Sequence, residues 1–170
     1  NGINSDIMFD NMVHKFRWGG IENPKVYLDE NNLKSCSIFR SLFAELVETL
    51  ITEGKNDKAL EALDYCMKVI PAKTVPMDYM FISFAKDYYQ LGQKAKADKM
   101  VEEMADNSIK NLDWYFQLNN QQALSAYRDI YENLAICQGI VTMSQEYNKA
   151  NFDKYYQKFM PYFQKYNSMK

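Results

Sequence analysis

The chain has 170 residues, of which 47% are hydrophobic and 15% aromatic, so it can bury a core and is not disordered throughout. Its 20 basic and 22 acidic residues give a net charge of -2, which predicts neither a nucleic-acid surface nor a polybasic membrane patch. The sequence contains only 6 glycines and 4 prolines. Because a sheet-rich chain of this length needs many turns, this scarcity favours an all-α fold.

Residues 1–32 predict an irregular N-terminal arm that lies over the body of the fold. A short helix is expected over residues 7–16, where apolar side chains recur every four positions. The turn-forming residues of segment 18–24 follow it, and residues 26–28 are expected to be extended.

Residues 33–170 predict a helical-repeat domain built from three antiparallel hairpins. The predicted hairpins cover residues 33–71, 74–117 and 121–167. The second is expected to open near Thr74, with Pro76 in its first turn. In the third, residues 121–147 predict one continuous helix, and Pro161 is expected to kink or shorten the last helix.

Two stretches of these hairpins repeat one pattern, with Gly92 following Gly54 after 38 positions (92 − 54). The stretches read Leu46-Val47-x-x-Leu50-x-x-x-Gly54-x-x-x-Lys58-Ala59 and Phe84-Ala85-x-x-Tyr88-x-x-x-Gly92-x-x-x-Lys96-Ala97. Their offsets resemble the tetratricopeptide repeat, although its usual period is about 34 residues, Val47 replaces its small residue, and the second unit lacks a closing proline. The resemblance implies helix hairpins stacked as a short tetratricopeptide-like solenoid, whose usual role is to hold a partner.

Tetratricopeptide arrays form a concave binding face from the first helix of each pair. Carried onto this sequence, that face gives the candidate partner-binding residues Glu48, Thr52, Tyr79, Ser83, Lys86, Tyr89 and Gln90. Tyr79 and Tyr89 lead this set, because tyrosine offers apolar area with a polar tip. The alternative is that both tyrosines pack against the arm or the third hairpin.

The arm carries a second candidate surface, in which basic and aromatic residues alternate. Its candidate docking residues are His14, Phe16, Arg17 and Trp18. We expect the aromatic side chains to plug the first hairpin, whereas nucleic-acid stacking and anchoring at a membrane interface are the alternatives. His14 is the only histidine and has no cysteine or carboxylate cluster beside it in sequence, so it does not indicate a metal site.

Nothing in the sequence indicates catalysis, a cofactor or a metal. It contains no Ser-His-Asp order, glycine-rich phosphate loop, metal-ligand spacing or dinucleotide-binding fingerprint. Cys36, Cys66 and Cys137 are too few and too scattered for a disulfide framework, so three free thiols are expected. One disulfide in an oxidising compartment is the alternative.

The arm also carries a family resemblance, in the stretches Met8-Phe9-Asp10-Asn11-Met12, Lys15-Phe16-x-Trp18-Gly19-Gly20 and Asn23-Pro24-x-Val26-Tyr27-Leu28-Asp29-Glu30-Asn31. These resemble the C-terminal region of a family of multi-pass membrane proteins common in Bacteroidetes, whose membrane half resembles protein O-mannosyltransferases. The resemblance extends over the entire chain. It implies a soluble helical-repeat tail on the periplasmic side of the inner membrane. No catalytic residue of the membrane half carries over, because that half is absent here.

The chain begins with Asn1 rather than methionine, as expected for a piece of a longer protein. Its longest apolar runs are too short to cross a bilayer, so no transmembrane segment is expected in the chain itself. Together the residues and the resemblance predict a non-catalytic protein-interaction or accessory domain, the periplasmic tail of a membrane glycosyltransferase-like protein. The expected partner is a protein or peptide segment, or the membrane half of the same parent. A scaffold or oligomerisation module unrelated to glycosyl transfer is the alternative.

Overall fold

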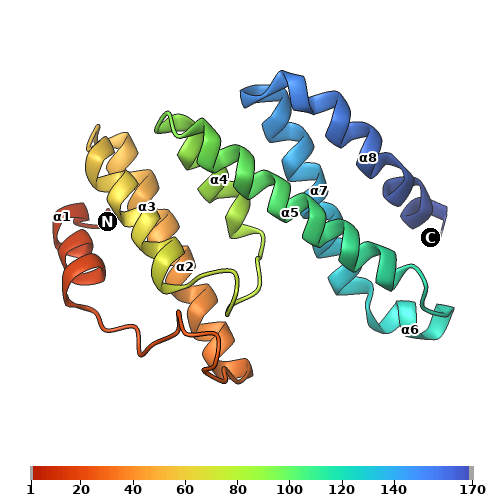
Figure 1. Ribbon diagram of the computed structural model, residues 1–170, viewed down its shortest axis with the longest axis horizontal. Coiled ribbons are helices and arrows are strands. Elements are labelled where there is room, and N and C mark those ends of the chain that lie inside the picture. The colour runs from red at the N-terminus through yellow and green to blue at the C-terminus, as the bar shows by residue number, and fades with distance from the viewer. Residues whose placement is uncertain (1, 169–170) are drawn as a thin grey trace. The chain divides into compact units, whose positions relative to one another are not determined.

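The computed structural model describes residues 2–168, and within them it contains eight α-helices, a short π-helix and no strand (Figure 1). The predicted all-α fold is therefore confirmed. The chain divides into two compact units, one up to Gln93 and the other from Lys94 onward. None of the helices in residues 2–168 combines the length and the apolar character needed to cross a membrane.

The first unit opens with the helix α1, Ser5–Phe9, which runs directly into the π-helix η1, Asp10–Lys15. The side chain of Asn4 caps α1 by accepting a hydrogen bond from the backbone N–H of Ile7 at 3.0 Å. This confirms the short helix expected in the arm. The segment expected to be extended, residues 26–28, forms irregular chain with no strand pairing.

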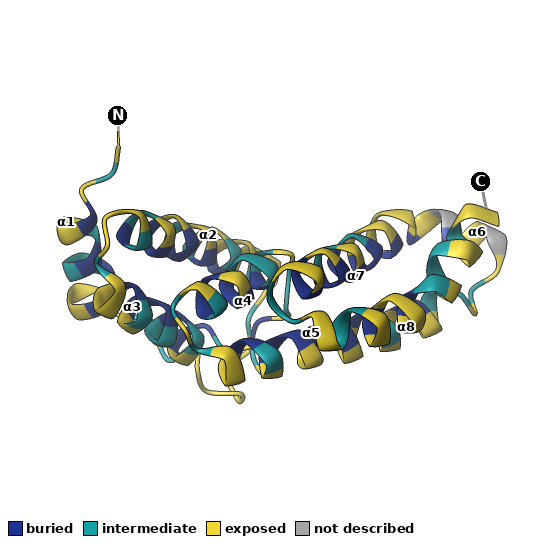
Figure 2. Ribbon diagram, turned by 90° about the horizontal axis from the view of Figure 1, so that it is seen from above, coloured by how far each residue is buried: buried dark blue, intermediate teal, exposed yellow. Residues whose placement is uncertain are grey.

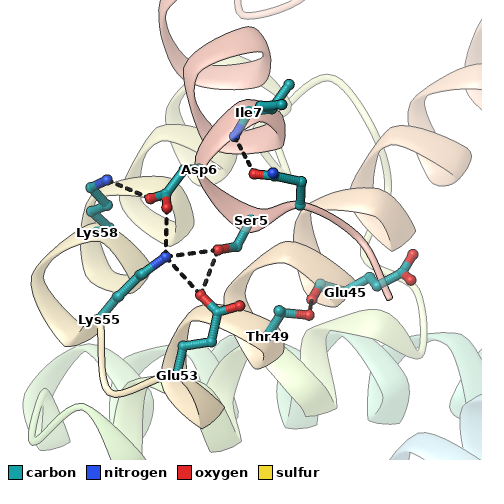
Figure 3. Close-up of polar contacts among 9 residues, drawn as sticks. Ser5, Asp6, Ile7, Glu45, Thr49, Glu53, Lys55 and Lys58 are labelled. Carbon is teal, nitrogen blue, oxygen red and sulfur yellow. Dashed lines mark hydrogen bonds and ion pairs between the residues drawn. The ribbon is translucent and has the colours of Figure 1, made fainter. Parts of the chain in front are cut away.

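A polar cluster ties α1 to the corner of the first hairpin, as Figure 3 shows. The ammonium of Lys55 lies 2.8 Å from carboxylate oxygens of both Asp6 and Glu53, and it donates to the hydroxyl of Ser5 at 3.1 Å. Lys58 contacts the other oxygen of Asp6 at 2.8 Å. The hydrogen bonds from the two lysines lower the pKa of Asp6 from 3.8 to about 2.

The first predicted hairpin is confirmed by α2, Glu30–Thr52, and α3, Asn56–Val69, which pack side by side (Figure 1). Asp29 caps α2 by accepting from the N–H of Asn32 at 2.8 Å. The buried stripes of the two helices form a large part of the core of this unit and appear dark blue in Figure 2. They comprise Phe43, Leu46, Val47 and Leu50 of α2 with Ala59, Ala62, Leu63 and Cys66 of α3. Burying one such leucine stabilises a fold by about 1.5–3 kcal/mol.

The corners at Gly54 and Gly92 have the same backbone geometry, as the repeated pattern predicted. The glycines have φ angles of 73° and 72°, in the left-handed region. In both corners the glycine N–H bonds to the carbonyl three residues earlier at 3.0 Å, and the next N–H bonds to the carbonyl five residues earlier at 2.8 Å. This pair of bonds is the Schellman motif, which satisfies the last carbonyls of a helix.

The helix α4, Met80–Gln90, begins later than the sequence predicted. The expected opening near Thr74, with Pro76 in the first turn, is wrong because this segment is a linker bonded to α2. The completely buried guanidinium of Arg40 donates to the carbonyl oxygens of Val75 at 2.8 Å and of Pro76 at 2.6 Å. Because the carbonyls of Val75 and Pro76 accept hydrogen bonds from Arg40, this segment is held in a non-helical conformation.

The second unit contains α5, Lys94–Tyr115, α6, Asn120–Ser125, α7, Tyr127–Tyr147, and α8, Lys149–Ser168. Helix α5 packs against α7 and α8, which also pack against each other. The prediction of a single helix over residues 121–147 is wrong in its first turns, because the helix is interrupted at Ala126, between α6 and α7.

Helix α8 continues through Pro161, so the predicted shortening is wrong. Contacts with α5 and the segment just after it hold the helix on both sides of the proline. Before it, Lys158 lies 3.1 Å from Asp106, and after it the hydroxyl of Tyr162 donates to Asp113 at 2.7 Å. The Lys165 ammonium then donates to the Phe116 carbonyl at 3.1 Å. These contacts offset the one backbone hydrogen bond that proline cannot donate.

Cys36, Cys66 and Cys137 are buried free thiols, as expected from their spacing. Burial raises the pKa of the Cys66 and Cys137 thiols to about 12. Both therefore stay neutral and pack as small apolar side chains.

Candidate functional site

A groove of about 310 Å³ lies between α2 and α4 in the first unit, and we refer to it as the α2–α4 groove. Its walls carry mostly polar side chains with an apolar contribution from one residue of each helix. The lining residues are Ser41, Ala44, Glu45 and Glu48 of α2 and Met80, Ser83, Lys86, Asp87 and Gln90 of α4. On each helix they recur three or four positions apart, which places them on one face.

The two helices that form the groove run in the same direction. Arg40 of α2 sits over the ring of Phe81 near the start of α4, 4.7 Å from its centroid. Two turns further along α2, the charge of Glu48 acts on Asp87, nearer the end of α4. The fixed Arg40 contact at one end therefore sets the register that brings the two polar stripes face to face.

Asp87 is the most unusual residue of the groove. Asp87 is 6% exposed, and its carboxyl group forms neither a hydrogen bond nor an ion pair with any of the described residues. Burial, and after it the negative charge of Glu48, raise its pKa from 3.8 to about 7. The positive charge of Lys86 opposes this shift. A buried carboxyl without a partner is costly when ionised, so Asp87 holds its proton up to near neutral pH.

Four of the predicted partner-binding residues line the groove, namely Glu48, Ser83, Lys86 and Gln90. The other three lie elsewhere in the first unit. Thr52 ends α2 and donates its hydroxyl to the Glu48 carbonyl at 2.8 Å. Tyr79 precedes the first turn of α4 with 50% of its surface exposed. Tyr89 is half-buried on α4. The two tyrosines that led the prediction are thus outside the groove.

Sequence reasoning did not single out Asp87, although a signal for it exists. Asp87 stands four positions after Ser83 and three before Gln90, so it shares their helix face. The helical period alone therefore placed it beside two predicted residues. Its burial depends on α2, a neighbour that the period does not reveal.

A second cavity, of about 670 Å³, lies where the arm crosses α2. The ring of Trp18 packs against Phe39 and Phe43 of α2, with centroids 5.1 Å and 5.4 Å apart. Phe16 contacts both Trp18 and Phe39. Among the described residues no acceptor reaches the buried indole N–H of Trp18.

The remaining candidate docking residues, His14 and Arg17, are exposed. The imidazole of His14 meets the ring of Phe9 edge-on, at 5.4 Å between centroids, and Arg17 lines the arm cavity. The structure therefore gathers Phe16, Arg17 and Trp18 at one cavity and leaves His14 on the neighbouring π-helix.

Within residues 2–168 no three side chains of histidine, cysteine, aspartate or glutamate gather in a way that would hold a metal ion. In comparisons with known proteins, no family model matches the sequence, and neither a curated protein nor a solved structure gives a significant match. The class that the fold defines is accordingly an all-helical domain of paired helices.

Proposed function

We propose that this chain is a non-catalytic interaction domain that binds a segment of a partner protein in the α2–α4 groove. The observation that carries the proposal is the meeting of Glu48, Ser83 and Gln90 in one groove between two helices that run in the same direction. A volume of about 310 Å³ suits individual side chains of a bound segment. Neighbouring first helices with this geometry also fit the tetratricopeptide-like interpretation of the repeat.

Selection from a random peptide library against the 170-residue chain tests this proposal. We expect the enriched peptides to shift the amide resonances of Ala44, Glu48 and Ser83 in the NMR spectrum of the labelled protein. A Ser83→Trp substitution should fill the groove and abolish binding, because an indole ring takes up the space that a peptide side chain needs.

The matched control is Ser35→Trp, at an exposed position on the same helix as Glu48 but outside the groove. This variant should bind the selected peptides as the unmodified protein does. Peptides that bind both variants equally would remove the groove from the proposed function.

A second candidate role is that of an accessory domain beside the membrane half of a glycosyltransferase-like protein. Its motivation is the family resemblance of the arm together with the exposed side chains there. Phe16 and Tyr27 are 45% and 87% exposed and line the arm cavity with Lys15 and Arg17. Aromatic side chains next to basic ones suit a contact with a neighbouring protein surface that carries acidic groups.

Expressing the full-length parent with and without this domain, and assaying glycosyl transfer to folded acceptors, tests the accessory role. A Phe16→Ser and Tyr27→Ser double variant should lower transfer as the deletion does. The Tyr131→Ser variant, at a 60% exposed position in the second unit, serves as the control. Equal transfer by all of these proteins would contradict an accessory role.

A further inference from the structure

We propose that the α2–α4 groove receives the cationic side chain of a lysine or arginine in the partner segment, and that Asp87 forms the ion pair with it. This inference rests on the proposed peptide-binding function and names the chemistry of the bound residue. It depends on the charge of the groove, on the lack of a partner for Asp87, and on the apolar residues beside it.

The charge of the groove favours a cation. Its lining includes the carboxyl groups of Glu45 and Glu48 from α2 and of Asp87 from α4, against the single ammonium of Lys86. Lys86 adjoins Asp87 in sequence, and side chains at adjacent helix positions diverge. Lys86 is also exposed, and its charge only partly offsets the effects of burial and of Glu48 on the buried carboxyl. An anionic ligand would be repelled at the groove floor.

Asp87 supplies an independent argument, because a buried carboxyl without a donor is a vacant acceptor. Its side chain is 6% exposed and has no hydrogen bond or ion pair among residues 2–168, yet it lines the groove. An ammonium or guanidinium group entering the groove would give the ionised carboxyl the donors that the fold withholds. The raised pKa of Asp87 agrees with this vacancy, because burial and the charge of Glu48 outweigh the opposing charge of Lys86 in the free protein.

The apolar residues of the groove suit the stem of the same side chain. Ala44 is buried and Met80 is half-buried, one on each wall. Lysine and arginine lay their methylene stems on apolar surface while the charged head reaches a polar partner. A metal ion is a poorer fit, because the described acidic side chains do not gather closely enough to hold one. The groove therefore matches an elongated organic cation.

An NMR titration of the 170-residue chain with three matched peptides tests the inference. The probes are lysine–serine, glutamine–serine and glutamate–serine repeat peptides of equal length. We expect the lysine peptide to shift the amides of Glu48, Ser83 and Asp87 at about pH 8 and to bind about tenfold more tightly than the glutamine peptide. The glutamate peptide should cause no shift in the groove.

The near-isosteric Asp87→Asn variant should lose about tenfold in affinity for the lysine peptide. The Glu61→Gln variant removes an acid from an exposed position of α3 and should bind like the unmodified chain. At pH values well below 7 the carboxyl of Asp87 is protonated and neutral, so lowering the pH from about 8 to about 5 should weaken binding of the lysine peptide about tenfold or more. The Asp87→Asn variant should lose part of this pH dependence. Glu45 and Glu48 of α2 and Lys86 of α4 remain in both proteins.

Equal binding of the lysine and glutamine peptides in the groove, unaffected by Asp87→Asn, would overturn this inference and leave the proposed peptide-binding function intact. Equal affinity of spermidine and the lysine peptide would overturn the assignment to a protein segment. If no selected or repeat peptide shifts the groove amides, both the inference and the proposed function fail.

Discussion

Arg40 and Val75, 35 positions apart in sequence, are joined by a buried hydrogen bond of 2.8 Å from the guanidinium Nη2 to the backbone carbonyl. The same nitrogen donates to the Ile70 carbonyl at 3.0 Å, and Nη1 donates to that of Pro76 at 2.6 Å. One side chain thus satisfies three carbonyls of the linker between α3 and α4. It fixes where α4 begins and therefore where the α2–α4 groove lies.

Replacing Arg40 by methionine keeps most of the side-chain volume and leaves these carbonyls buried without donors. We expect the free energy of unfolding to fall by about 3 kcal/mol, measured by urea denaturation. Arg128→Met, at an exposed position of α7, should change it by less than about 0.5 kcal/mol. Equal stability of the two variants would contradict the assigned role of Arg40.

Asp87→Asn should stabilise the protein at alkaline pH. The pKa of Asp87 rises on folding from 3.8 to about 7, so between these pH values the folded state binds more protons than the unfolded state. The free energy of unfolding contributed by this group therefore falls as the pH rises toward about 7 and stays low above it. We expect the variant to gain about 1–3 kcal/mol near pH 8.

The same Asp87→Asn variant should gain almost nothing below the unfolded pKa of 3.8, because the carboxyl is then neutral in both states. Urea titrations across this pH range measure the difference. A constant difference between variant and parent at every pH would show that Asp87 does not titrate as its burial requires.

Gly54→Ala and Gly92→Ala should destabilise the protein by similar amounts. Both glycines have positive φ angles, and a β-carbon added at either position would meet nothing within 4 Å. The loss in free energy of unfolding should therefore come only from holding an alanine in the left-handed backbone conformation, about 1–2 kcal/mol for each variant. Thermal denaturation measures it, with Gly2→Ala as the control at a glycine where the φ angle is not positive. Clearly unequal losses would contradict the equivalence of the two corners.

Asp6→Asn should loosen α1 from the corner of the first hairpin, because Lys55 and Lys58 then lose their shared carboxylate. We expect faster amide hydrogen exchange in α1 and unchanged exchange in α3. Since folding lowers the pKa of Asp6 to about 2, the contact should persist above about pH 4 and weaken as the pH falls through about 2. Asp153→Asn, at an exposed position of α8, is the control, and equal exchange in both variants would contradict the tether.

The corners of the hairpins could be predicted from the sequence because they depend on local chemistry. A glycine that follows an apolar helical stripe indicates a left-handed helix end, and both Gly54 and Gly92 adopt it. The start of α4 could not be predicted in this way. Pro76 is suited to a first helical turn, but its carbonyl is bonded to a side chain 36 positions away, and local propensity contains no term for that bond.

The sequence by itself determined that the chain is helical, where its glycine corners fall and which residues share each helix face, because these follow from a period of about 3.6 residues. Glu48, Ser83, Lys86 and Gln90, which the sequence assigned to such faces, line the groove. Only the tertiary structure decided which faces meet. It buried Asp87 against α2 and enclosed Arg40 among backbone carbonyls, because the environment of a charged group depends on neighbours that are distant along the chain.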